Sequence, residues 1–265
     1  MTRTVGVIGA GFVGGAVIAA FTDQPDVKVE VVDPVCSDLT ISDLTADIVF
    51  VCVPTPSLPS GDVDVSTVND VMRDLSFTCF AGIVVIKSTI TANHLVELKN
   101  TYSDLNLVYN PEFLTEKNAI TDFQNPQMQI LGGEWSDCDQ VEQLYVQHSS
   151  VRISPTFKTD LVSASLLKYT INSWLATKVT FMNELYQMHM MSGAETTWEQ
   201  FTDMLSRDSR VGDSHLQVPG PDGVFGFGGH CFPKDTQAFL HWASQSRVDL
   251  SVLKQAIDVN NQIRS

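Results

Sequence analysis

The chain has 265 residues, of which 43% are hydrophobic, and its formal net charge is −15. This length suggests one large or two small domains, and no apolar run reaches the ~18 residues that cross a membrane. The negative charge repels nucleic acids and anionic lipids, so we expect neither as a partner. Five cysteines without metal-ligand spacing indicate reduced thiols, no bound metal and a cytoplasmic protein.

The first predicted strand and helix carry a glycine fingerprint. A β-branched run over residues 4–9 leads into Gly9-Ala10-Gly11-Phe12-Val13-Gly14, and a helix is predicted over residues 12–22. In such a turn the first glycine permits the bend, the second admits a diphosphate, and the third lets the helix pack on the strand. A second predicted strand, residues 27–32, ends in Asp33, which is placed to bind the adenosine ribose. Because no arginine follows Asp33, we expect NAD rather than NADP.

Strands and helices then alternate along the chain. Strands are predicted over residues 47–53, 83–87 and 105–109, with helices over residues 65–78 and 91–101. This rhythm predicts the α/β class, with a Rossmann-type, doubly wound parallel sheet that binds ligands at the carboxyl ends of its strands. The predicted NAD contacts are therefore the fingerprint and the loops after the strands: Gly9, Gly11, Phe12, Val13, Gly14, Asp33, Val53, Pro54, Thr55 and Thr89.

The second half of the chain is predicted to be helical. Residues 159–191 contain no Gly or Pro and carry apolar residues on several faces, which indicates one long central helix. One face can cover the first domain and the other a second copy of the chain, so we expect a homodimer through this helix. We place the boundary between an NAD-binding domain, residues 1–157, and a helical domain, residues 158–265. A short helix over residues 193–206 and a polar loop over residues 207–229 follow.

Lys168 and Asn172 lie four residues apart on the long helix and therefore share a face. They are either a solvated surface pair or, in a cleft, a cation and a neutral donor for a developing oxyanion.

A single cysteine follows a glycine run in Gly226-Phe227-Gly228-Gly229-His230-Cys231-Phe232-Pro233-Lys234-Asp235. The Pro-Lys-Asp triplet predicts a helix start, because proline suits the first helical position. The positive end of that helix would stabilise a thiolate, and Lys234 would add to this if its side chain turns back. We interpret Cys231 as a covalent nucleophile; the alternative is a small buried cysteine in a glycine-rich turn.

Taken in order, these motifs resemble the UDP-glucose/GDP-mannose dehydrogenase family. The matching segments run across nearly the whole chain. They are the fingerprint glycines, Val51-Cys52-Val53-Pro54-Thr55-Pro56, Lys87-Ser88-Thr89, Asn110-Pro111-Glu112-Phe113-Leu114-Thr115-Glu116, Lys168 with Asn172, Asn183-Glu184, Arg210-Val211-Gly212 and the glycine–cysteine segment. The form of Lys87-Ser88-Thr89 resembles the glucose branch of the family more than the mannose branches.

The resemblance implies an NAD-dependent, four-electron oxidation of a nucleotide sugar's primary alcohol to a carboxylate, with UDP-glucose to UDP-glucuronate as the expected case. Cys231 would carry first a thiohemiacetal and then a thioester. The implied catalytic roles are oxyanion stabilisation by Lys168 and Asn172, water positioning by Asp235 and Thr89, a base for thioester hydrolysis in Glu112, and a nicotinamide or water contact in Glu116. The implied substrate contacts are Glu112, Phe113, Leu114, Lys168, Asn172, Arg210, Phe227, Gly228 and Cys231, with Arg210 reaching the sugar or the phosphate.

The sequence also departs from the family pattern. The family has a C-terminal domain that grips the nucleotide, and this sequence ends about where that domain would begin. Ser165 stands where the family has a glutamate, and Gln127 and Met128 stand where it has an arginine. We therefore expect a weak or altered affinity for the substrate. Two other readings remain: a single-hydride 3-hydroxyacid dehydrogenase, and a catalytically idle NAD-binding accessory subunit.

Overall fold

The computed structural model describes residues 2–264, with the side chain of Glu116 excepted. It divides into two compact units, each described below by itself. The first comprises the chain up to Pro56 together with Val63–Lys168, and the second comprises Ser57–Asp62 and the chain from Tyr169 onward. This division by compactness falls within the long helix, while the domain boundary after residue 157 stays a prediction.

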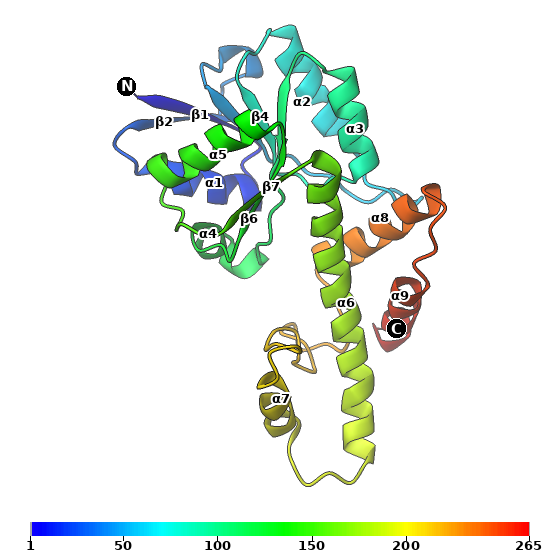
Figure 1. Ribbon diagram of the computed structural model, residues 1–265. Coiled ribbons are helices and arrows are strands. Elements are labelled where there is room, and N and C mark those ends of the chain that lie inside the picture. The colour runs from blue at the N-terminus through cyan, green and yellow to red at the C-terminus, as the bar shows by residue number, and fades with distance from the viewer. Residues whose placement is uncertain (1, 265) are drawn as a thin grey trace. The chain divides into compact units, whose positions relative to one another are not determined.

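The first unit is built on a seven-stranded sheet (Figure 1). Its strands are β1 (Arg3–Ile8), β2 (Val27–Val32), β3 (Ile48–Val51), β4 (Ile83–Ile86), β5 (Asn106–Tyr109), β6 (Gln129–Gly133) and β7 (Thr156–Thr159). The strand order is β2-β1-β3-β4-β5-β6-β7. Strands β2 and β3 lie on opposite sides of β1. The strand order therefore reverses beside β1, and α/β sheets bind ligands at such a point.

The predicted α/β class is confirmed, but the sheet is not wholly parallel. Strands β5 and β6 pair antiparallel, whereas the other neighbours are parallel. A parallel connection needs an element that carries the chain back across the sheet. Helix α4 (Ala119–Gln124), which precedes β6, has only six residues. The chain therefore turns back at the carboxyl end of β5.

Helices cover both faces of this sheet, and the inner strands contribute alternate residues to two separate cores. On β3, Val49 and Val51 belong to the core under α2 (Ser66–Phe77) and α3 (Ala92–Thr101). Ile48 and Phe50 belong to the core under α1 (Phe12–Thr22), α4 and α5 (Trp135–His148). Burial on both faces explains why the strands read as continuous apolar runs. Two short 3-10 turns, η1 (Ile41–Asp43) and η2 (Glu116–Asn118), also belong to this unit.

Helices form the second unit. Most of the 31-residue helix α6 (Leu161–Met191) belongs to it, with α7 (Trp198–Ser206), α8 (Cys231–Gln245) and α9 (Ser251–Arg264) (Figure 1). Thr197 and Gln200 form a reciprocal capping box, which starts α7 later than the sequence pattern indicated. Within residues 2–264, no helix is long and apolar enough to cross a membrane.

The start of α8 corrects one prediction. The helix begins at Cys231, two residues before the expected start at Pro233. Proline is compatible with this position, because the N–H groups of the whole first turn have no partner within a helix. Cys231 is therefore the first residue of the helix itself.

Candidate active site

The fingerprint turn and Asp33 meet at the carboxyl ends of β1 and β2. Gly9 has a φ of +90°, a conformation that L side chains rarely adopt. The next residue, Ala10, donates its N–H to Oδ2 of Asp33 at 2.8 Å, and Val35 donates to Oδ1 at 2.9 Å. These main-chain donors lower the pKa of Asp33. Asp33 is thus held as an ionised acceptor beside the turn, as a ribose-binding residue must be.

A cavity of about 620 Å³ lies over the first turn of α1. It is lined by Gly11, Phe12 and Gly15 on one side and by Lys117 and its neighbours at the start of α4 on the other. A Cβ at Gly11 would meet no described atom within 4 Å, so packing does not explain this glycine. The open cradle fits the diphosphate of a dinucleotide, since the helix N-terminus favours anions. Lys117, which was not among the predicted residues, adds a cation to the lining of this cavity.

The loops after β3 and β4 are joined by hydrogen bonds. Thr55 donates its hydroxyl to the main-chain oxygen of Thr89 at 2.9 Å, and Ser88 donates to the main-chain oxygen of Val53 at 2.6 Å. The predicted residues Val53, Thr55 and Thr89 are thereby brought together at one edge of the sheet, with Pro54 between the first two.

Lys87 is buried directly after β4, with 2% of its surface exposed. Its Nζ donates to the main-chain oxygen of Asn110 at 3.1 Å and to Oδ1 of Asn110 at 3.0 Å, and lies 5.1 Å from the centre of the Phe123 ring. Burial lowers the pKa of Lys87 from 10.5 to about 8. Lys87 has no predicted role, because its neighbours in the sequence do not show that it is buried.

The lowered pKa of Lys87 predicts a pH-dependent stability. Between pH 8 and pH 10.5 the unfolded chain holds a proton on this lysine that the folded chain has released. Raising the pH through this window therefore favours the folded state. The free energy of unfolding of the wild type should rise by about 3 kcal/mol relative to that of a Lys87→Met variant. Urea denaturation across the window measures this, and a difference independent of pH would contradict it.

Glu112 and Lys168 meet in the first unit. Lys168 donates its Nζ to the main-chain oxygen of Glu112, and the same Nζ lies 3.5 Å from the Oε1 atom and 5.1 Å from the centre of the Phe113 ring. Oε2 of Glu112 accepts the N–H of Leu114 at 2.6 Å. Lys168 is therefore a buried cation against a carboxylate rather than a solvated surface residue.

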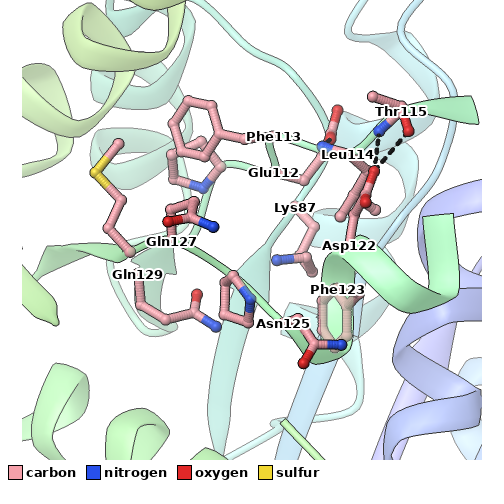
Figure 2. A pocket seen from close by; sticks show the side chains of 13 residues that line it. Lys87, Glu112, Phe113, Leu114, Thr115, Asp122, Phe123, Asn125, Gln127 and Gln129 are labelled. Atoms are coloured by element: carbon pink, nitrogen blue, oxygen red, sulfur yellow. Dashed lines mark hydrogen bonds between the residues drawn. The ribbon is translucent and has the colours of Figure 1, made fainter. Parts of the chain in front are cut away.

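A cavity of about 310 Å³ adjoins this pair. Figure 2 shows Lys87 and Glu112 across this cavity from Gln127 and Gln129. Met128, which also departs from the family pattern, lines this cavity as well.

Ser165 is buried and donates its hydroxyl to the main-chain oxygen of Ile90 at 2.8 Å. The predicted role of Glu116 falls on a side chain outside the described part of the chain.

In the second unit, Asn172 donates its amide to Oδ2 of Asp235 at 2.6 Å, and Lys234 donates to Oδ1 at 2.7 Å. Asp235 is 1% exposed and lies one helical turn after the half-buried Cys231. The structure thus joins two of the predicted residues, Asn172 and Asp235, directly. The ammonium of Lys234, which was predicted to stabilise the thiolate if its side chain turns back, is bound by the buried Asp235 carboxylate.

Two glycines of the run before Cys231 lie against side chains of α9. A Cβ at Gly228 would lie 2.6 Å from a guanidinium nitrogen of Arg264, and one at Gly226 would lie 2.5 Å from Oδ1 of Asn260. These two glycines therefore admit side chains of α9, whereas a Cβ at Gly229 would meet no described atom within 4 Å.

Two further predicted substrate contacts have other neighbours in this structure. Phe227 is buried in a core of the second unit, and its N–H donates to Asn260 at 2.6 Å. Arg210 is exposed and pairs with Asp208 at 2.5 Å. Their roles toward a substrate stay predictions.

Two domains of one known protein family match the two halves of the chain. Residues 34–149 match the NAD binding domain of the UDP-glucose/GDP-mannose dehydrogenase family, and residues 162–262 match its central domain. The chain belongs to the UDP-glucose/GDP-mannose dehydrogenase family. Its first half is thus the family's NAD-binding domain.

Individual relatives agree with this assignment. The chain is 32% identical over 225 residues to a UDP-glucose 6-dehydrogenase of Rickettsia felis, covering 82% of this chain and 48% of the relative. It is also 32% identical over 238 residues to a GDP-mannose 6-dehydrogenase of Pseudomonas aeruginosa, covering 83% and 52%. The chain therefore spans about half the length of these curated relatives, and its identity to the glucose and mannose enzymes is equal.

A solved structure shows the same fold. The UDP-glucose dehydrogenase of Pyrobaculum islandicum superposes with a TM-score of 0.80 at 21% identity, over 99% of this chain and 68% of that one.

Proposed function

We propose that the chain carries out the NAD-dependent, four-electron oxidation of a nucleotide sugar's primary alcohol to a carboxylate, with UDP-glucose as the first candidate. The observation that carries this proposal is the start of α8. Cys231 is its first residue, and one turn later Asp235 is buried and bonded to Asn172. A thiol at a helix N-terminus is favoured as a thiolate, which a single-hydride dehydrogenase does not need.

NAD, when bound, accepts the hydrogen that leaves the substrate carbon with its electron pair. The residues that fit it are the open cradle at Gly11, the ionised Asp33 and, across the cavity, Lys117. Asp33 orients the adenosine ribose, and Lys117 offsets the charge of the diphosphate in a chain whose net charge is −15.

The chain's own groups then act on the substrate carbon. First, the alcohol passes its hydroxyl proton to a water molecule positioned by Asp235 and Thr89 and its hydride to NAD, and so becomes an aldehyde. The Cys231 thiolate adds to the aldehyde carbon, and the resulting oxyanion is stabilised by the Lys168 ammonium and the Asn172 amide. Loss of a second hydride from this adduct, to a second NAD that has replaced the NADH, leaves a thioester on the sulfur.

Hydrolysis of the thioester completes the reaction. Water attacks the thioester carbon, a carboxylate takes the proton of the water, and the thiolate leaves. Glu112 and Asp235 are the carboxylates we propose for this step, with Thr89 positioning the water.

The test is a panel of UDP-glucose, UDP-N-acetylmannosamine, GDP-mannose and simple 3-hydroxyacids, each incubated with NAD. We expect two NADH for each nucleotide sugar consumed, measured by absorbance with quantification of the acid formed. One NADH for each 3-hydroxyacid consumed would establish the single-hydride reaction instead. NADH binding without turnover of any substrate would favour an accessory subunit.

We also propose that two copies of the chain associate through α6. Trp174, Phe181 and Met188 recur every seven residues on this helix and are 64%, 60% and 65% exposed. Because side chains seven residues apart lie on one face of a helix, they form a single apolar stripe. A stripe of three large apolar side chains on a helix of 31 residues fits a second copy of the same helix.

A Trp174→Asp/Phe181→Asp double variant is expected to be a monomer, because two carboxylates would be desolvated in the paired stripe. Light scattering after size-exclusion chromatography measures the mass against the 29.1 kDa of one chain. Val252→Asp is the matched control, since Val252 is also apolar and exposed but lies on α9. A monomeric wild type would contradict the proposal.

A further inference from the structure

Two buried lysines from different elements hold the loop that follows β5. Lys87 comes directly after β4 and Lys168 lies on α6, and each is 2% exposed. Lys87 donates to the main-chain oxygen of Asn110, and Lys168 donates to the main-chain oxygen of Glu112. Only Pro111 separates the two carbonyl groups along the chain. The main chain on both sides of Pro111 is therefore held by a charged donor.

Asn110 connects Lys87 to the rest of the sheet. It is fully buried, and its side-chain oxygen accepts from Lys87 at 3.0 Å and from the hydroxyl of Tyr145 at 2.8 Å. Its amide donates to the main-chain oxygen of Ile130 at 2.8 Å. These bonds fix Asn110 from β4, β6 and α5 together, and a fully paired buried network of this kind is rigid.

The direction of the Glu112 carboxylate depends on this loop. Its Oε2 atom accepts the N–H of Leu114, which is in the same loop, and its Oε1 atom lies 3.5 Å from Nζ of Lys168. A shift of the main chain at Pro111 would therefore move both the Glu112 carboxylate and the main-chain oxygen that accepts from the Lys168 ammonium.

Burying an ammonium group is costly, and an apolar side chain of similar size would fill the same space without that cost. The charge of Lys87 thus calls for a reason other than packing. We propose that Lys87 is a positioning residue, which acts through Asn110 to fix the main chain of Pro111 and Glu112 and so aligns Glu112 with Lys168. The catalytic consequence rests on the proposed function, whereas the positioning itself does not.

The experiment compares Lys87→Met with Lys158→Met. Lys158 lies on β7 of the same unit, where it pairs with Asp139 and Glu142 on α5, so this control also removes a paired lysine. Hydrogen exchange of the amides of residues 112–115 should speed up about tenfold in Lys87→Met, because charge-assisted hydrogen bonds are lost. Exchange in β1 should stay unchanged, and Lys158→Met should resemble the wild type in both regions.

In the active enzyme, kcat of Lys87→Met should fall about a hundredfold with the KM for NAD unchanged, because a displacement of the reacting groups by about 1 Å has that effect. Unchanged exchange of residues 112–115 would overturn the inference, and so would faster exchange that extends to β1, since this indicates general loosening. If the wild type oxidises no nucleotide sugar, the proposed function fails while the exchange data still decide the positioning.

Discussion

A Cys231→Ser variant is expected to lose formation of the acid by about a thousandfold or more, because a serine hydroxyl is a far weaker nucleophile than a thiolate near neutral pH. Cys231 is the first residue of α8, at the end of the helix where the N–H groups have no partner within the helix and the helix dipole is positive. A serine there keeps the geometry but carries no negative charge for the helix terminus to stabilise.

The number of NADH molecules formed separates this prediction from a general loss of activity. The variant should form at most one NADH for each substrate consumed, since oxidation past the aldehyde needs the sulfur adduct. Cys79→Ser is the matched control, because Cys79 is an exposed thiol in the turn before β4. Two NADH for each substrate in Cys231→Ser would remove the sulfur from the mechanism and leave only the fold assignment.

Substitution by alanine at two neighbouring glycines of α1 should change the free energy of unfolding in opposite directions. A Cβ at Gly14 would lie 1.8 Å from the main-chain oxygen of Gly9, whereas a Cβ at Gly15 would have its nearest neighbour, the main-chain oxygen of Ala10, at 3.8 Å. Gly14→Ala must therefore push α1 away from β1, and we expect it to lower the free energy of unfolding by about 3 kcal/mol. Gly15→Ala should raise it by about 1 kcal/mol, because alanine is the better helix former.

Chemical denaturation of the two variants without NAD measures both effects, and each variant controls for the other because the substitution and the helix are the same. A titration with NADH extends the test to the cofactor. Gly14→Ala should bind NADH more weakly, because the displaced helix no longer presents its N-terminus at the turn. Equal stability of the two variants would show that α1 does not pack on β1 as closely as the structure has it.

Local signals in the sequence were enough for much of the first unit. The helix over residues 12–22 and the strand over residues 27–32 have the predicted bounds. The glycine fingerprint and the β-branched runs act within a few residues, so their meaning does not depend on distant parts of the chain.

The elements that were wrong or missed depend on other parts of the chain. Strand β6 runs antiparallel to β5 because α4 is too short for a crossover. Helix α8 begins before Pro233 rather than at it. The space beside Gly226 and Gly228 holds side chains of α9, which lie more than thirty residues further along the chain.

The sequence by itself determined the fold class, the family resemblance and most of the candidate site, because each rests on motifs of a few adjacent residues. Only the tertiary structure decided that Lys87 is buried against Asn110, that Tyr145 completes this network across 35 positions of sequence, and that Lys117 lines the same cavity as the fingerprint turn. The physical reason is that burial and long-range hydrogen bonds are fixed by how the elements pack, which no local propensity encodes.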